Sequence, residues 1–197
     1  MKTSWQTIAN ILKKNGVVII PTDTLYGIVA KASSREAVER IYTIKGRDKG
    51  KPCIVLITSF DDLKDFDIDI EKFSAGQWSL FLHHIWPGKV SVVLPCPGTK
   101  WKYLHRGTGS IAFRMIGPRN KNLYCLIKEI GPLVAPSANP AGLAPAHTAL
   151  QAQKYFNDKV DAYVKGSARD ISPSTLVSLL GSKPKILRQG SVDIYKK

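Results

Sequence analysis

The 197-residue sequence predicts an α/β fold built as one domain. Apolar, β-branched runs of strand length alternate with amphipathic segments of helical period along the whole chain. No Pro/Gly/Ser-rich linker, internal repeat or shift of composition divides it, and 44% hydrophobic residues supply enough apolar material for a single core. We therefore expect residues 1–197 to form a single domain.

Two helices are predicted in the first quarter of the chain. Over residues 5–12 the apolar side chains recur at helical spacing, Thr3 or Ser4 can cap the first turn, and Gly16 can stop the helix. Residues 34–42 show the same periodicity and form the second helix, which leads into a basic segment.

The remaining elements follow from the same two patterns. Short β-branched runs bounded by proline, glycine or polar residues predict strands, and longer amphipathic runs with a capping hydroxyl predict helices. The strands are expected at 17–20, 54–57, 90–94, 110–116, 133–135, 160–164, 175–180 and 186–188, and the further helices at 74–85, 121–130 and 148–156, with a short helical turn near 59–62.

The charge of the chain is strongly positive. Lysine and arginine number 29 against 15 acidic residues, which gives a formal net charge of +14. A surplus of this size favours polyanionic ligands, so nucleotide phosphates, RNA or both are the expected partners.

The cysteines indicate a reducing, cytoplasmic setting. Cys53, Cys96 and Cys125 lie far apart with no Cys-x-x-Cys spacing, and apolar neighbours predict buried packing for Cys53 and Cys125. The histidines show no metal-ligand spacing either, so no metal site is assigned. The N-terminus lacks the pattern of a secretion signal, and no apolar run is long enough to cross a bilayer, so no membrane association is expected.

The first predicted strand ends in a cluster of polar groups, Pro21-Thr22-Asp23-Thr24-Leu25-Tyr26-Gly27. Pro21 closes the strand because proline cannot donate the next ladder hydrogen bond. Ligands in open α/β sheets bind beyond the carboxyl ends of strands, which favours a site here. Threonine and aspartate also form turns with their own backbone, so a purely structural turn explains the residues equally well.

The segment Lys45-Gly46-Arg47-Asp48-Lys49-Gly50-Lys51 places four cations around two glycines between a helix and a strand. Glycine lets backbone N–H groups approach an anion, while lysine supplies a point charge and arginine a forked donor. This composition suits phosphates, although it is not a P-loop. The alternative is an exposed basic loop without a ligand.

Five further residues have the character of a binding site. Ser137 and Asn139, two residues apart in extended chain, can grip one ligand, although the same pattern is common in turns. Arg114 lies within an apolar strand, where an unpaired cation is costly, so it needs a carboxylate or phosphate from the protein or a ligand. Ser174 precedes an apolar strand and Arg188 ends one, so each is also expected to meet a polar or charged partner.

Taken together and in this order, these segments with Trp86-Pro87-Gly88 resemble the YrdC family of threonylcarbamoyl-AMP synthases in its short, single-domain form. The resemblance covers nearly the whole chain. It implies a YrdC-like twisted mixed sheet with helices on both faces and a concave, positively charged face. The sequence departs from the family's pattern at Asp48 and Lys51, at Ser91, after Arg114 and after Asn139.

The resemblance implies an enzyme, a nucleotidyltransferase that joins L-threonine, bicarbonate and ATP into threonylcarbamoyl-AMP and pyrophosphate for t6A modification of tRNA. Mg2+ is the implied cofactor, accompanying ATP. A tRNA or double-stranded RNA and the t6A transferase machinery are the implied macromolecular partners. Positioning and charge neutralisation can catalyse this transfer without a protein nucleophile.

The resemblance also assigns roles to residues. The implied catalytic residues are Lys45, Arg47, Ser137 and Asn139. The implied threonine-binding residues are Thr22, Tyr26, Arg114, Ala135 and Ser174, with Ala135 contributing backbone. The implied ATP-binding residues are Arg47, Lys51, Ser110, Ser137, Pro145 and Arg188.

Two other functions compete with synthesis of threonylcarbamoyl-AMP. The charge of +14 also suits a non-catalytic RNA-binding member of the same fold. A carbamoyl-transfer module like that of hydrogenase maturation proteins is disfavoured, because those proteins carry zinc-type cysteine pairs that this chain lacks.

Overall fold

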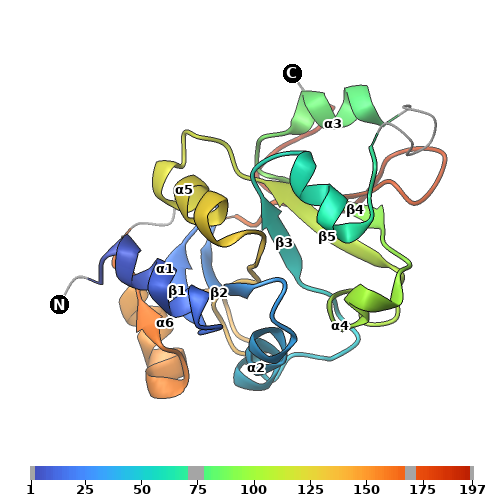
Figure 1. Cartoon of the computed structure of the whole chain (residues 1–197). Coiled ribbons are helices and arrows are strands. Elements are labelled where there is room, and N and C mark those ends of the chain that lie inside the picture. The colour runs from blue at the N-terminus through green and yellow to red at the C-terminus, as the bar shows by residue number, and fades with distance from the viewer. Residues whose placement is uncertain (1–2, 71–77, 167–171, 196–197) are drawn as a thin grey trace.

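The computed structural model describes residues 3–70, 78–166 and 172–195. Their strands form one mixed sheet in the order β7-β1-β2-β6-β3-β5-β4-β8-β9 (Figure 1). The strands are β1 Val18–Pro21, β2 Tyr26–Lys31, β3 Ile54–Ile57, β4 Val90–Pro95, β5 Ser110–Met115, β6 Leu133–Val134, β7 Ala162–Tyr163, β8 Thr175–Ser178 and β9 Lys185–Arg188. The α-helices are α1 Trp5–Lys13, α2 Arg35–Lys45, α3 Ser79–Ile85, α4 Lys102–His105, α5 Lys121–Ile130 and α6 Ala149–Phe156, and the 3-10 turns are η1 Asp61–Phe66, η3 Thr99–Trp101 and η4 Asn157–Lys159.

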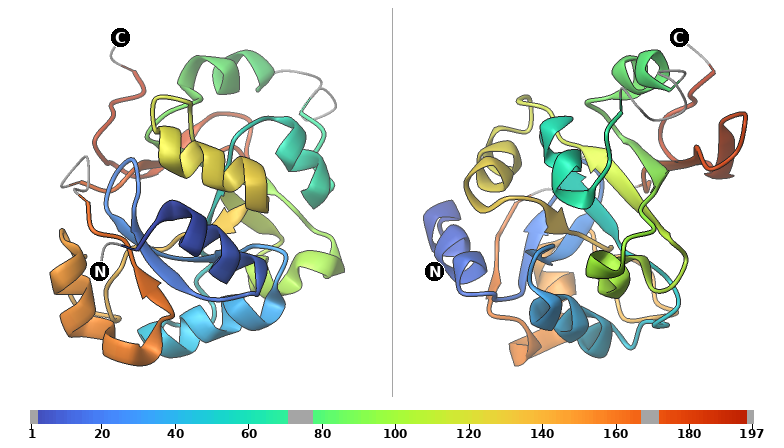
Figure 2. Two further views of the ribbon diagram at one scale, coloured as in Figure 1. Left: turned by 60° about the vertical axis from the view of Figure 1, so that its left-hand side comes forward. Right: turned by 45° about the vertical axis from the view of Figure 1, so that its right-hand side comes forward.

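Helices cover both faces of the sheet, as the sequence predicts. On one face α1 and α5 lie side by side and bury Ile8, Leu12 and Leu123 against β1, β2 and β3 (Figure 2). Helices α2, α3, α4 and α6 and turn η1 bury their apolar side chains in the larger core on the opposite face. The mixed α/β architecture is thereby confirmed.

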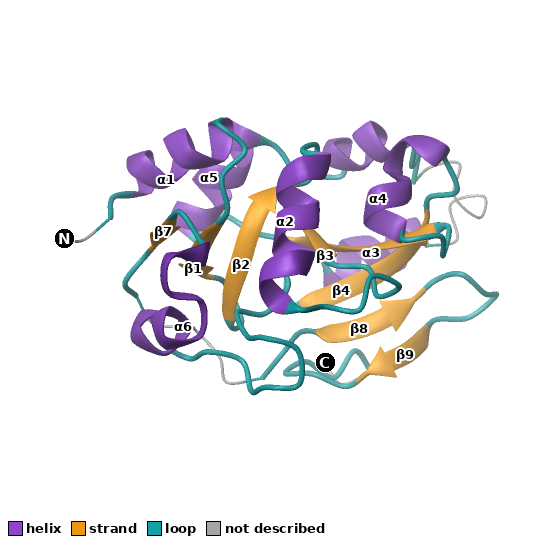
Figure 3. Ribbon diagram, turned by 90° about the horizontal axis from the view of Figure 1, so that it is seen from below, coloured by secondary structure: helices purple, strands orange, loops and turns teal. Residues whose placement is uncertain are grey.

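The face that carries α1 and α5 is only partly covered. Beyond β3 the side chains that point to this face are only half-buried, namely Ala112 on β5, Val93 on β4 and Leu176 on β8. In Figure 3 β8 and β9 form the outer hairpin of this half of the sheet. The sheet surface over β5, β4 and β8 is therefore partly open to solvent.

Predicted helix starts agree closely with the structure. Ser4, Ser34 and Thr148 each occupy the N-cap and accept a hydrogen bond from the backbone N–H three residues on. The predicted helix at 74–85 is observed from Ser79, and residues 71–77 lie outside the described part of the chain.

Gly16 follows the first helix for a different reason from the expected one. Asn15, with φ 60°, adopts the left-handed conformation that ends the helix. A Cβ at Gly16 would stand 2.3 Å from Ile11 Cγ2, so glycine is needed there for close approach.

The main omission of the sequence analysis is β2. Residues Tyr26–Lys31 pair antiparallel with β1, from Val18 opposite Val29 to Pro21 opposite Tyr26. The polar cluster after the first strand is consequently the turn of a hairpin. It is not the end of a strand that crosses over to a helix.

Cys125 was wrongly predicted to be buried. Helix α5 turns Leu123, Leu126 and Ile127 into the core, and the helical period leaves Cys125 on the exposed side, whereas Cys53 is buried as expected. Among the described residues no helix has the length and apolar character needed to cross a membrane.

Candidate functional site

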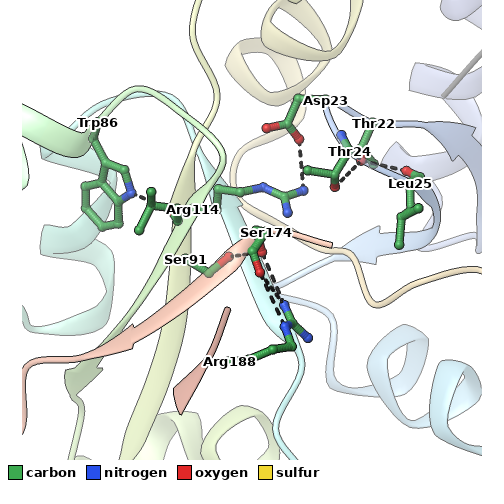
Figure 4. Close-up of polar contacts among 10 residues, drawn as sticks. Thr22, Asp23, Thr24, Leu25, Trp86, Ser91, Arg114, Ser174 and Arg188 are labelled. Carbon is green, nitrogen blue, oxygen red and sulfur yellow. Dashed lines mark hydrogen bonds and ion pairs between the residues drawn. The ribbon is translucent and has the colours of Figure 1, made fainter. Parts of the chain in front are cut away.

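The turn between β1 and β2 is closed by Thr22. Its hydroxyl donates to Leu25 O at 2.7 Å and accepts from Thr24 N at 3.2 Å. The turn interpretation of this segment is therefore correct for Thr22, whose buried hydroxyl organises the backbone. Asp23, at the tip, projects away from these contacts toward β5 (Figure 4).

Asp23 meets the buried cation of β5. Arg114 Nη2 lies 3.0 Å from Asp23 Oδ1, and the two side chains are only 5% and 14% exposed. The carboxylate that Arg114 needs thus comes from the protein. Arg114 Nε has no hydrogen-bond partner in the described structure, so part of its donor capacity remains unused.

Arg114 belongs to a row of side chains that crosses the partly covered sheet face. Strand register places Leu56 beside Arg114, and Leu176 lies between Ser91 and Arg188. The pairing of Val92 with Phe113 sets Ser91 next to Arg114 in the same row. The row therefore carries the buried Arg114 and Ser91 and the exposed Arg188 on one face of the sheet.

Ser174 links Ser91 to Arg188 at the far end of this row. Its hydroxyl lies 2.8 Å from Ser91 Oγ, and its carbonyl oxygen accepts from Arg188 Nη2 at 2.8 Å (Figure 4). Burial, and then the positive charge of Arg114, lower the pKa of Arg188. No carboxylate in the described part of the chain lies within ion-pair distance of Arg188. Within the described ranges the two arginines therefore share one carboxylate, that of Asp23.

The Trp86-Pro87-Gly88 segment fixes the start of β4 against the end of β5. Trp86 Nε1 donates to Val90 O at 2.7 Å, and Gly88 N donates to Met115 O at 3.1 Å. These bonds hold together β4 and β5, the strands that carry Ser91 and Arg114, which gives the segment a positioning role.

A second cluster lies beside the N-terminal end of β2. Lys45, the last residue of α2, is buried, and its Nζ donates to the carbonyl oxygens of Ser137, at 2.6 Å, and Asn139. Ser137 Oγ donates to Asn139 Oδ1 at 2.6 Å. Burial, and then the charge of Arg47, lower the pKa of Lys45 to about 8. The structure thus brings together three of the four predicted catalytic residues.

The two clusters are joined through the hairpin. Gly27 bridges to Ser137, and Ala138 N donates to Tyr26 O at 2.8 Å. Strand β2 therefore has the Ser137–Asn139 segment beside its first residues, and the turn that precedes it carries Asp23 toward Arg114. Ligands that contact both clusters at once would therefore lie across this hairpin.

Arg47 and Lys51 belong to the loop after α2. Arg47 donates from Nε to Lys51 O at 3.1 Å and from Nη2 to Pro52 O at 2.9 Å. The Lys51 side chain is 72% exposed and 3.8 Å from Asp48. Both side chains lie on the same loop as predicted, and their contact with a phosphate stays a prediction.

The other predicted residues line these clusters or support them. Tyr26 Oη donates to Gly166 O at 2.7 Å, and Ala135 N donates to Ile54 O at 2.9 Å, so that backbone N–H is already used. Ser110 is buried on β5, on the same face as Arg114. Pro145 is half-buried beside Ala146, whose N–H binds Ala138 O.

Sequence reasoning missed Ser91 and Asp23 as members of the site. Ser91 is a polar residue inside the apolar strand Val90–Pro95, which is the same signal that singles out Arg114. Asp23 could not be assigned because its partner is 91 positions away in a strand whose register the sequence does not reveal.

The fold and site define the chain as a YrdC-like α/β domain, with a mixed sheet and one partly covered face that carries Arg114 and Arg188. The family model named for Sua5, YciO and YrdC, described as "Telomere recombination", matches residues 10–190. The chain belongs to this Sua5/YciO/YrdC family.

Two relatives and one solved structure illustrate the similarity. A protein of Mycobacterium tuberculosis named putative threonylcarbamoyl-AMP synthase is 33% identical over 92% of this chain and 81% of its own length. The threonylcarbamoyl-AMP synthase of Bacillus subtilis is 32% identical over 93% of this chain and 52% of its own. The crystal structure of Pyrococcus abyssi Sua5 with L-threonine matches with a TM-score of 0.84 and 29% identity, covering 94% and 54%. The chain thus spans about half the length of the last two.

Proposed function

We propose that this protein is a threonylcarbamoyl-AMP synthase, which joins L-threonine, bicarbonate and ATP and releases pyrophosphate. The observation that carries the proposal is the pair of arginines, Arg114 and Arg188, on one partly covered sheet face, where Asp23 supplies the one carboxylate found among the described residues. An anionic ligand would neutralise the remaining positive charge. A family member of known structure binds L-threonine, whose carboxylate is such a group.

The reaction needs no covalent intermediate on the protein. The amine of threonine captures the carbon of bicarbonate with loss of water and gives a carbamate. A carbamate oxygen then attacks the α-phosphorus of ATP, and the bond from that phosphorus to pyrophosphate breaks. Cations that neutralise charge and groups that orient the reactants are sufficient for such a transfer.

In this proposal the two clusters hold the two substrates. Arg114 pairs with the threonine carboxylate near Thr22, Tyr26 and Ser174, while Lys45 and Arg47 face the phosphates. The remaining ATP contacts are assigned to Lys51, Ser110, Ser137, Pro145 and Arg188, and Asn139 orients the junction of the substrates.

Mg2+ enters the proposal with ATP. The described ranges contain no group of three histidine, cysteine, aspartate or glutamate side chains that could hold a metal ion. We therefore assign the ion to phosphate oxygens and water, which magnesium commonly keeps as ligands. The tRNA and the t6A transferase machinery are proposed as downstream partners, and the net charge of +14 supports contact with RNA.

Threonine-dependent release of pyrophosphate tests the proposal. Purified protein with ATP, Mg2+ and bicarbonate should release pyrophosphate when L-threonine is present and not when it is omitted. Arg114→Gln should raise the KM for threonine more than the KM for ATP. Release that is indifferent to threonine would exclude the proposed reaction.

A further inference from the structure

The loop that follows α2, residues 46–52, is held by a tyrosine that the proposed chemistry does not use. Tyr42 lies on α2, is 2% exposed, and donates from its phenol to Lys51 O at 2.8 Å. Arg47 Nε donates to the same carbonyl oxygen at 3.1 Å. The Lys51 carbonyl oxygen thus accepts one hydrogen bond from helix α2 and one from Arg47 of the loop itself.

The ring of Tyr42 is in turn fixed by Arg106, the residue that follows α4. The Arg106 guanidinium carbon lies 3.7 Å from the centre of the ring, and Nη1 binds Glu39 Oε1 on α2 at 2.6 Å. The Arg106 side chain is only 9% exposed. A guanidinium over an aromatic face is attractive, and more so when it is desolvated, so Arg106 holds the ring from one face while Glu39 fixes Arg106.

Burial raises the pKa of Tyr42 to about 12. The phenol therefore stays protonated at neutral pH and remains a donor to Lys51 O.

We infer that Tyr42, fixed by Arg106 and Glu39, is a positioning residue that holds residues 46–52 in the conformation that presents Arg47 and Lys51 to ATP. The inference rests on the proposed function, because it takes ATP as the ligand of this loop. It assigns to Tyr42 no contact with substrate and no part in the chemical step.

Tyr42→Phe tests the inference, since it removes the phenol and keeps the ring under Arg106. Loss of one hydrogen bond should weaken ATP binding about fivefold. That change should appear in the Kd for ATP, measured by calorimetry without threonine, and in the KM for ATP. The KM for threonine should stay unchanged, because Arg114 lies on β5 and Asp23 in the turn before β2, outside the loop that Tyr42 holds.

Tyr103→Phe is the matched control. Its phenol donates to Ala32 O at 2.7 Å, burial likewise raises its pKa to about 12, and neither residue belongs to the loop. The control should lose a similar amount of thermal stability and keep wild-type affinity for ATP. Arg106→Lys, which keeps the charge but loses the planar guanidinium, should weaken ATP binding in the same direction as Tyr42→Phe.

The outcomes separate the two proposals. If the wild type binds ATP but releases no threonine-dependent pyrophosphate, the proposed function fails and the calorimetric comparison still decides the role of Tyr42. An unchanged Kd for ATP in Tyr42→Phe, or an equal loss in Tyr103→Phe, would overturn the inference. A wild type that does not bind ATP would overturn both.

Discussion

Replacing Asp23 by asparagine isolates the ion pair at the centre of the site. The substitution keeps the size of the side chain and removes the charge that faces Arg114 at 3.0 Å. Breaking a buried pair by removing one charge leaves the other uncompensated, which typically costs about 3–5 kcal/mol. The amide oxygen of asparagine can still accept one bond, so we expect a loss of about 3 kcal/mol in the free energy of unfolding, the lower end of that range.

Urea unfolding of the ligand-free protein measures this loss, and Glu129→Gln is its control. Glu129 pairs with Lys13 at 2.6 Å, but the side chains are 39% and 51% exposed, and exposed pairs contribute about 0–1 kcal/mol. The midpoint should therefore fall markedly for Asp23→Asn and barely for Glu129→Gln. Equal losses in the two variants would refute the reasoning that burial makes the Asp23–Arg114 pair costly to break.

Three further predictions concern the second cluster and the net charge. Ser137→Ala should lower threonine-dependent turnover about a hundredfold or more with the fold intact, checked by steady-state rates beside circular dichroism, and a near-normal rate would remove Ser137 from the site. Burial lowers the pKa of Lys45 from 10.5 to about 8, so the unfolded chain binds that proton more tightly than the folded protein does. Between these two pH values the free energy of unfolding of the wild type, relative to that of Lys45→Met, should therefore rise with pH. Parallel pH profiles of the two proteins in urea melts would contradict this. Binding of tRNA, followed by fluorescence anisotropy, should weaken at least about tenfold between 50 and 200 mM salt, and salt-independent binding would argue against phosphate contacts.

Local sequence patterns were sufficient for most elements of the fold. The cap at Ser4, the helical periodicity and the β-branched runs marked most helices and strands correctly, because capping and burial depend on a few neighbouring residues. Strand β2 was missed because Tyr26–Lys31 follows the polar turn directly, and its pairing with β1 depends on register that local pattern does not encode.

The candidate site was predicted in its composition and only partly in its contacts. An arginine inside an apolar strand predicts a buried partner of opposite charge, so Arg114 could be found from the sequence. That the partner is Asp23, and that Lys45 turns onto the carbonyl oxygens of Ser137 and Asn139, depends on which strands neighbour one another in the sheet. The same holds for the row from Arg114 through Ser91 to Arg188.

The most direct test of the central claim follows the carbon of bicarbonate into the product. Purified protein is incubated with ATP, Mg2+, L-threonine and isotopically labelled bicarbonate, and the nucleotide product is identified by mass spectrometry. We expect threonylcarbamoyl-AMP carrying the label, with pyrophosphate formed in equal amount. Pyrophosphate accompanied only by AMP, or a nucleotide product without the label, would contradict the claim that this site joins all three substrates.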